Sequence, residues 1–174
     1  MALTRRQTLA ALGAAPAGML IHQPPALAQL PPAWLGRRLA ARAPGRPTPQ
    51  AAEGPFYVEN RFERRDLTEG HPGLPLELVL TLVAANRLDP LAGKRVDVWH
   101  ADAAGCYSGF QGQGDERTIS TAGQTFLRGT QVSDPGGAVR FLTIYPGWYA
   151  GRTAHVHVKI FVDDGDVFDG QVYF

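Results

Sequence analysis

Two histidines separated by one residue, His155 and His157, lie in the stretch GRTAHVHVKIFV near the end of the chain. Arg152 precedes the first of them by three positions, and Tyr149 precedes it by six. Neutral imidazole is the commonest metal ligand among side chains, so this pair could bind a metal ion. The alternative interpretation of so short a motif is a pair of half-exposed histidines on the surface of a sheet.

The residues around the two histidines predict the element that positions them. Every second position holds a β-branched residue: Val156, Val158, Ile160 and Val162. This period of two is typical of a strand, in which successive side chains point to opposite faces. The two histidines are therefore expected on one face of the strand and the valines on the other. Their Cα atoms would lie about 6–7 Å apart, which lets two imidazoles converge on one ion.

Composition limits the classes of protein to which the chain can belong. The 174 residues suit one domain, and the 20 glycines and 14 prolines favour a turn-rich architecture. A formal net charge of +1 gives no reason to expect nucleic acid or an anionic membrane as a partner. The single cysteine, Cys106, excludes an intramolecular disulfide.

Further strands are predicted along the chain. Apolar or alternating runs cover residues 74–85 and 95–101, with Val96 and Val98 on one face, and residues 133–145 read as a turn followed by a strand. Residues 161–168, FVDDGDVF, predict a hairpin with Asp164-Gly165 at the bend. Several short strands separated by turn signals predict an all-β fold, a β-sandwich of mostly antiparallel strands.

The N-terminal part of the chain is interpreted separately. Residues 1–28 resemble an export signal of the twin-arginine type, because Arg5 and Arg6 precede an Ala/Leu-rich run that ends in small residues. This interpretation predicts a periplasmic or extracellular protein. The apolar run is too short to span a bilayer, so no membrane anchor is expected in the mature form. Residues 29–47 are rich in Pro, Ala and Arg and are interpreted as a linker, with the folded domain starting near Thr48.

Two tyrosines in the chain, considered together with the histidine motif, suggest which metal could bind. Iron(III) is a hard cation, and tyrosine phenolate ligates iron in some haem proteins. A bound cation stabilises the phenolate, although the free phenol has a pKa near 10. Tyr149, together with Tyr107 in DAAGCYSGF, therefore favours a ferric site over a zinc or magnesium site.

Four stretches of this sequence together resemble the intradiol ring-cleavage dioxygenases, the family of catechol-, hydroxyquinol- and protocatechuate-cleaving enzymes. These stretches are TPQAAEGPFY, VDVWHADAAGCYSGF, TFLRGTQVSDPGGAVRFLTIYPGWYAGRTAHVHVKI and GQVYF. The resemblance extends from about Thr48 to Phe174. It implies a β-sandwich that holds non-haem Fe(III) and cleaves a catechol-type aromatic diol with O₂ to a muconate-type diacid.

The resemblance also implies a role for individual residues. The metal ligands would be Tyr107, Tyr149, His155 and His157. Arg152 matches the active-site arginine of the family, and Tyr149 would also take part in catalysis by leaving the metal and accepting a proton from the diol. Substrate contacts are expected from Gln171 and Arg152, and from Pro55 and Tyr57 in the stretch Glu53 to Tyr57. Packing roles are expected for Trp99, His100, Cys106, Tyr145 and Trp148.

Two departures from the family pattern and two alternative functions complete the interpretation. The chain ends directly after GQVYF, where family members usually continue, so a dioxygenase domain spanning 48–174 and truncated at its C-terminus is expected. The chain also lacks the helical N-terminal domain of catechol-type members, which leaves homo-oligomerisation open.

One alternative is an exported, non-catalytic β-sandwich module that binds a metal or a carbohydrate. The other is a copper or zinc protein that uses the histidine pair.

Overall fold

The computed structural model describes residues 48–59, 61–163 and 166–174. The predicted export signal and linker lie outside the described residues and stay predictions. The described residues form strands and no helix, and hence no helix able to cross a membrane. The strands are β1 (Pro75–Thr81), β2 (Arg95–Trp99), β3 (Arg128–Val132), β4 (Ala138–Ile144), β5 (His155–Asp163) and β6 (Asp166–Tyr173).

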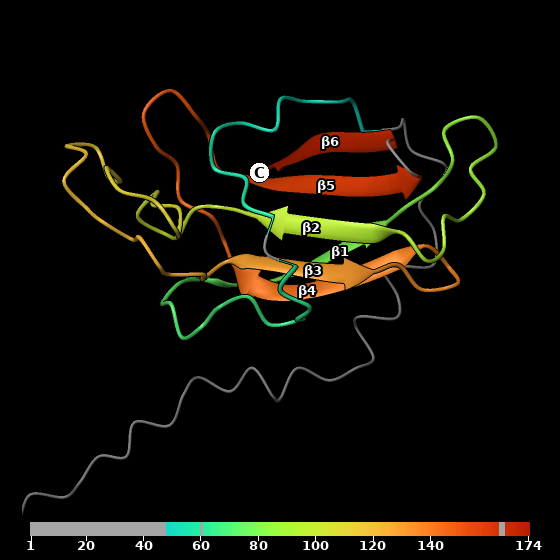
Figure 1. Cartoon of the computed structure of the whole chain (residues 1–174), viewed down its shortest axis with the longest axis horizontal. Coiled ribbons are helices and arrows are strands. Elements are labelled where there is room, and N and C mark those ends of the chain that lie inside the picture. The colour runs from blue at the N-terminus through green and yellow to red at the C-terminus, as the bar shows by residue number, and fades with distance from the viewer. Residues whose placement is uncertain (1–47, 60, 164–165) are drawn as a thin grey trace, which may run out of the picture. The chain divides into compact units, whose positions relative to one another are not determined.

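The six strands form two sheets (Figure 1). One sheet has the order β3-β2-β5-β6 and the other pairs β1 with β4, and every neighbouring pair is antiparallel. An additional segment, residues 62–67, runs parallel to an edge strand of each sheet, with Glu63 bridged to Thr130 on β3 and Asp66 to Leu142 on β4. The prediction of an all-β fold with mostly antiparallel strands is confirmed.

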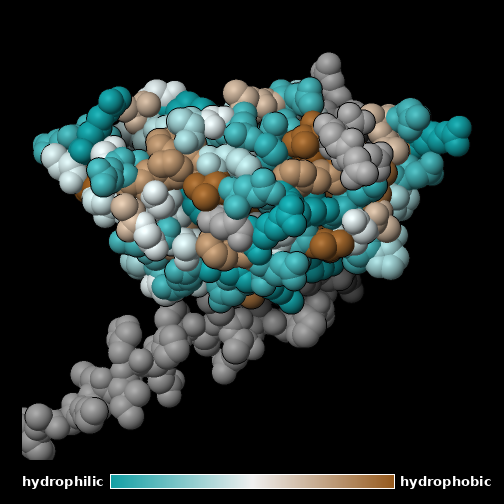
Figure 2. Space-filling view, viewed as in Figure 1, coloured by the Kyte–Doolittle hydropathy of each residue, from teal (hydrophilic) through white to brown (hydrophobic). Residues whose placement is uncertain are grey.

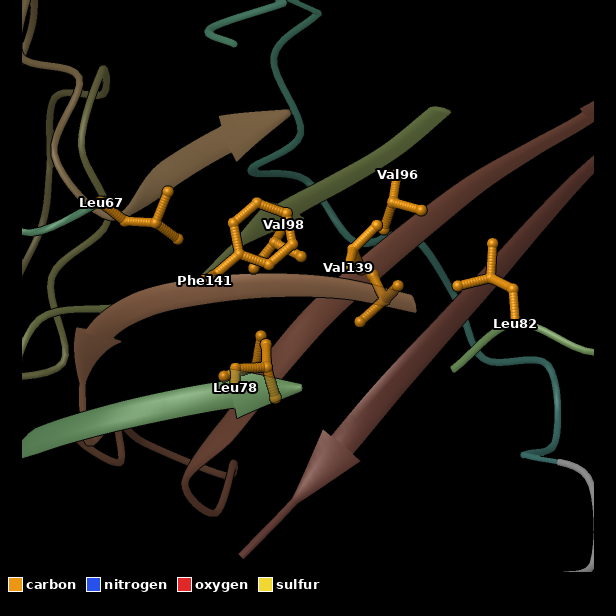
Figure 3. Packing of buried hydrophobic residues seen from close by; sticks show 9 residues of the cluster. Leu67, Leu78, Leu82, Val96, Val98, Val139 and Phe141 are labelled. Atoms are coloured by element: carbon orange, nitrogen blue, oxygen red, sulfur yellow. The ribbon is translucent and has the colours of Figure 1, made fainter. Parts of the chain in front are cut away.

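The hydrophobic core lies between the two sheets. Val96 and Val98 of β2 and Val156 and Val158 of β5 are at most 5% exposed. They pack with residues of the opposite sheet and its flanking segments, namely Leu67, Leu78, Leu82, Val139 and Phe141. Figure 3 shows these side chains converging from the two layers. Each such buried side chain contributes about 1.5–3 kcal/mol relative to its exposed state, so the predicted valine faces hold the sandwich together.

The other face of the four-stranded sheet is polar yet buried. Its central row crosses all four strands through directly paired residues: Arg128, Trp99, His157 and Gln171. These four side chains are between 2% and 7% exposed. The neighbouring row contains Thr130, Asp97, Lys159 and Asp169.

A strap, residues 51–59, lies over this polar face and closes it from solvent. Its main chain is joined to β6 by the hydrogen bond from Ala51 N to Asp169 O, at 2.9 Å. Its Glu53 carboxylate pairs with Lys159, and the Tyr57 hydroxyl donates to Asp97 at 2.8 Å. In Figure 1 the strap is the blue-green segment near the free edge of β6 and the end of β2. Residues that the sequence predicts at the start of the domain are therefore part of its polar layer.

Two strand predictions, and one strand that was not predicted, can be compared with the structure. The strand predicted over 74–85 ends at Thr81, because the chain then turns back on itself: Leu82 accepts a hydrogen bond from Leu91 N, and Val83 is bridged to Pro90. The β5–β6 pairing confirms the predicted hairpin, whose bend at 164–165 lies outside the described residues. Strand β3 was not predicted, because RGTQV lacks apolar alternation. Gly129 occupies its core-facing position, where Leu67 leaves no room for a Cβ atom.

The surface is mostly hydrophilic on the face shown in Figure 2, where hydrophobic residues form small, separate patches. This distribution is consistent with burial of the valine faces between the sheets.

Candidate metal centre

Four side chains from three segments converge at one end of the polar face. Tyr107 comes from the loop between β2 and β3, Tyr149 from the loop between β4 and β5, and His155 and His157 from β5. The Nε2 atom of His155 lies 3.3 Å from the Tyr107 hydroxyl, 3.4 Å from the Tyr149 hydroxyl and 3.1 Å from His157 Nε2. The two hydroxyls are 3.4 Å apart. The structure thus brings together the four residues predicted as ligands.

Hydrogen bonding alone does not account for this cluster. The Nδ1 atom of His155 is 2.6 Å from the carbonyl of Thr153, to which it donates, so its Nε2 carries a single lone pair. That lone pair faces the two hydroxyls, His157 Nε2 and Arg152 Nη2. Three of the four separations, at 3.3–3.4 Å, exceed the usual length of about 2.7–3.2 Å for such hydrogen bonds. One lone pair cannot serve four partners, whereas a metal ion between the donor atoms could bind several of them.

A first-row metal ion fits the space that the donor atoms define. Two ligand atoms about 2.1 Å from a metal, at angles of about 90–110°, are separated by about 3.0–3.4 Å. The four separations given above, between 3.1 and 3.4 Å, match this range. Among the described residues, no group of three or more His, Cys, Asp and Glu could hold a metal. A four-donor site here therefore has to include the phenols, which distinguishes it from an ordinary zinc site.

Burial sets the protonation state of the donors. His155 and His157 are 1% and 2% exposed, which rules out the half-exposed pair considered from the sequence. Burial lowers the pKa of His157 to about 3 and also lowers the pKa of His155, so both imidazoles are neutral and carry lone pairs at pH 7. Burial, reinforced by Tyr149, raises the pKa of Tyr107. A bound cation would reverse this shift and favour the phenolate.

The imidazole of His157 is fixed by packing. Trp99 stacks on it with 4.8 Å between ring centroids and an interplanar angle of 11°. The strap approaches another part of the ring, because a Cβ atom on Gly54 would lie 3.4 Å from His157 Cε1. The predicted packing role of Trp99 is confirmed, and this packing orients a candidate ligand.

A close contact between the two loops fixes the positions of the two tyrosines relative to each other. Asp102 organises the first loop, since its carboxylate accepts hydrogen bonds from the main chain of Ala104 and Cys106 at 2.9 Å. Its carbonyl accepts one from Gly147 N of the second loop, at 2.8 Å. A Cβ atom on Gly147 would lie 2.6 Å from two main-chain oxygens of the first loop. The approach therefore requires glycine at position 147 for steric reasons.

We expect Gly147→Ala to push the two loops apart and weaken metal binding. Main-chain atoms cannot yield as a side chain can, so overpacking here should cost about 1–3 kcal/mol in the free energy of unfolding. Urea denaturation and metal titration measure the two effects. Gly136→Ala is the matched control, because its added Cβ would meet only the Asp134 carboxylate, at 3.3 Å. Equal metal affinity in both variants would contradict this account of the loops.

Arg152 and Gln171 form a pair beside the four donors. The Arg152 Nη2 atom lies 3.3 Å from His155 Nε2 and donates to the side-chain oxygen of Gln171. Gln171 also accepts from the Tyr173 hydroxyl at 2.5 Å and donates to the carbonyl of Ala52 at 2.8 Å. None of the ion pairs found among the described residues involves Arg152. Its guanidinium is therefore held in place by a neutral amide, and no carboxylate in the described part of the chain compensates its charge.

The strap contributes to the site in a way that the sequence did not predict. Phe56 stacks on Tyr107, with ring centroids 4.4 Å apart. Pro55 is exposed, and the Tyr57 hydroxyl is bonded to Asp97, one row away from His157 on the sheet. The structure does not bring the Tyr57 hydroxyl to the four donors, and the substrate contacts of Pro55 and Tyr57 stay predictions. Phe56 lies between them in the same motif, EGPFY, which is the signal that could have identified it.

The packing roles predicted for other residues have different outcomes. His100 and Cys106 are buried, as expected, and the Tyr145 ring lies against Phe174. The prediction for Trp148 is wrong, because its side chain is 70% exposed. The main chain makes the contact there: the Trp148 carbonyl would lie 2.5 Å from a Cβ atom on Gly105. The indole is consequently directed to solvent, while the adjacent Tyr149 is directed to the centre.

The fold and the site define a β-sandwich protein with a mixed imidazole–phenol centre. A family model described as dioxygenase matches residues 52–174. The chain is 27% identical to the catechol 1,2-dioxygenase of Acinetobacter baylyi over 139 residues, which are 67% of this chain and 42% of that protein. It is 30% identical to the chlorocatechol 1,2-dioxygenase of Cupriavidus pinatubonensis over 142 residues, 71% of this chain and 53% of that protein. The chain thus spans about half the length of these relatives.

Solved structures agree with the sequence matches. An intradiol ring-cleavage dioxygenase from Tetranychus urticae superposes with a TM-score of 0.66 and 36% identity, covering 73% of this chain and 64% of that one. The dioxygenase domain of a carbohydrate-binding fusion protein from a cellulolytic Streptomyces superposes with a TM-score of 0.59 and 32% identity, covering 74% and 75%. The chain belongs to the intradiol ring-cleavage dioxygenase family.

Proposed function

We propose that this protein is a non-haem Fe(III) enzyme that cleaves a catechol-type diol with O₂ between its two hydroxyls, giving a muconate-type diacid. The observation that carries the proposal is the clustering of His157 Nε2 and the two phenol oxygens within 3.1–3.4 Å of His155 Nε2, in a chain of this family. The matched relatives are named catechol and chlorocatechol 1,2-dioxygenases.

The donor set suits ferric iron. Tyr107, Tyr149, His155 and His157 would hold the ion, since phenolate oxygen is an anionic donor and both imidazoles are neutral. The bound ion would acidify a chelating diol and make its ring reactive toward O₂. Copper or zinc would not need two phenols beside the histidines.

The two tyrosines have different roles in this proposal. Tyr107 is 1% exposed and stacked under Phe56, so it stays in place. Tyr149 is half-buried and lies on a short turn in which its main chain and that of Arg152 exchange hydrogen bonds. Its phenolate oxygen would be the one that accepts a proton from the incoming diol, because Tyr149 is the less buried of the two tyrosines.

Arg152 supplies a fixed positive charge at the reacting ring. Gln171 holds its guanidinium through a neutral amide oxygen and does not neutralise the charge. A preorganised cation of this kind stabilises negative charge that develops as the ring opens. Gln171 thereby orients the arginine and links it to the strap through the Ala52 carbonyl.

The experiment is a metal analysis, a visible spectrum and an oxygen-uptake assay on the iron-loaded full chain. We expect one iron per chain, a tyrosinate-to-iron charge-transfer band, and O₂ consumption with catechol, hydroxyquinol or protocatechuate. Product analysis should show cleavage between the hydroxyls. Stoichiometric zinc in an active, colourless protein, or cleavage outside the diol pair, would overturn the proposal. Coloured protein that binds diols without consuming O₂ would favour the non-catalytic module instead.

A further inference from the structure

Arg128 is a buried arginine whose side-chain hydrogen bonds all go to the surroundings of Tyr107. Its side chain donates to Ser108 Oγ at 2.8 Å, to Ser108 O at 2.7 Å and to Phe56 O at 2.7 Å. Ser108 follows Tyr107 in the chain, and Phe56 stacks on the Tyr107 ring. One guanidinium therefore joins the loop that carries a candidate ligand to the strap that covers it.

The place of Arg128 in the sheet leads to the same group of residues. It is paired with Trp99 across β3 and β2, Trp99 is paired with His157, and His157 with Gln171. Arg128 thus lies at one end of this row. The same row contains His157, a candidate metal ligand, and Gln171, the residue that holds Arg152. The Arg128 guanidinium also lies 5.5 Å from the centroid of Phe110, which contacts Phe56 edge-on.

The charge of Arg128 is unusual for a residue with a purely structural role. The residue is 3% exposed, and none of the ion pairs between described residues includes it. Burying a cation without an acidic partner is costly. The cost is offset when anionic groups form nearby, as the proposed loaded centre requires.

We propose that Arg128 is a positioning residue that holds Tyr107 and Phe56 as one rigid unit at the metal centre. The inference rests on the proposed role of Tyr107 as a ligand. This positioning role requires the planar guanidinium. Its fork donates to three acceptors from two segments at once, a geometry that an ammonium group cannot reproduce. Loss of the unit lets the strap move and changes the geometry of the bond between Tyr107 and the metal.

The decisive variant is Arg128→Lys, which keeps the charge and removes the fork. We expect iron still to bind, the charge-transfer band to shift in wavelength, and KM for catechol to rise about tenfold from lost charge-assisted hydrogen bonds. In the metal-free protein, amide hydrogen exchange of residues 51–59 should become faster. Ser108→Ala removes one acceptor and keeps the arginine, so a smaller change in the same direction is expected from it.

Arg65→Lys is the control, because Arg65 pairs with Glu77 at the surface and lies outside the proposed site. It should leave the band, KM and the exchange of residues 51–59 unchanged. If Arg128→Lys lowers only the melting temperature and leaves band, KM and exchange as in wild type, the inference is wrong. If it does not fold, the same readouts on Ser108→Ala decide: an unchanged band and unchanged exchange overturn the inference. A wild-type protein without the band would instead reject the proposed function.

Discussion

Tyr107→Phe is expected to remove most of the visible colour of the iron-loaded protein and to weaken iron binding by at least about 100-fold, beyond the usual effect of losing a supporting residue. Phenylalanine preserves the stacking on Phe56 but removes the oxygen that lies 3.3 Å from His155 Nε2. The remaining colour would come from Tyr149. The measurements are the absorption spectrum and iron affinity in competition with a chelator.

Tyr145→Phe is the control for this experiment. Tyr145 lies four residues before Tyr149, and its ring packs on Phe174 away from the four donors. Its hydroxyl should be dispensable for both colour and iron affinity. A Tyr107→Phe protein that keeps the full band and affinity of wild type would remove Tyr107 from the ligand set.

Arg152→Ala is expected to keep the iron and its colour and to lose turnover by about 10²-fold or more, as for other preorganised electrostatic groups. The guanidinium lies beside the donors but supplies no lone pair, so metal binding does not depend on it. Arg152→Lys should recover part of the activity, because it restores the charge without the planar fork held by Gln171. Oxygen uptake at saturating catechol measures kcat directly.

Arg65→Ala provides the comparison for a change at an exposed arginine. Arg65 pairs with Glu77 at the surface and should have no effect on turnover. Near wild-type kcat in Arg152→Ala would exclude a catalytic role for this residue. Loss of iron together with activity would show that Arg152 supports the metal instead.

The sequence predicted those parts of the fold that depend on apolar periodicity. The valines of β2 and β5 alternate with polar residues, and this alternation placed His155 and His157 on the face opposite the core. Strand β3 could not be found in this way, because its core-facing position is filled by Gly129 and its other face carries polar residues. Its pairing depends on the neighbouring strand rather than on its own composition.

The sequence predicted which residues form the candidate site, but not how their side chains are oriented or held in place. The four donors were identified from the resemblance to the family, and the structure brings them together. Trp148 and Tyr149 show the limit of the approach, because two adjacent aromatic residues point in opposite directions for a reason that lies in the main chain of another loop. The link from Arg128 to Phe56 spans 72 positions, and no local pattern indicates it.

The strap has a consequence for how the protein is made. It is joined to β5 by a contact between residues 106 positions apart and to β6 by one between residues 119 positions apart. A chain emerging from the ribosome therefore carries the strap long before its docking surface exists. Topologies that depend on such distant pairings fold slowly, because the entropy cost of closing a long loop arises before the stabilising contacts form. Because the strap can dock only after β5 and β6 have been synthesised, we expect the imidazoles and phenols of the polar face to be open to solvent and to surrounding metal ions until then.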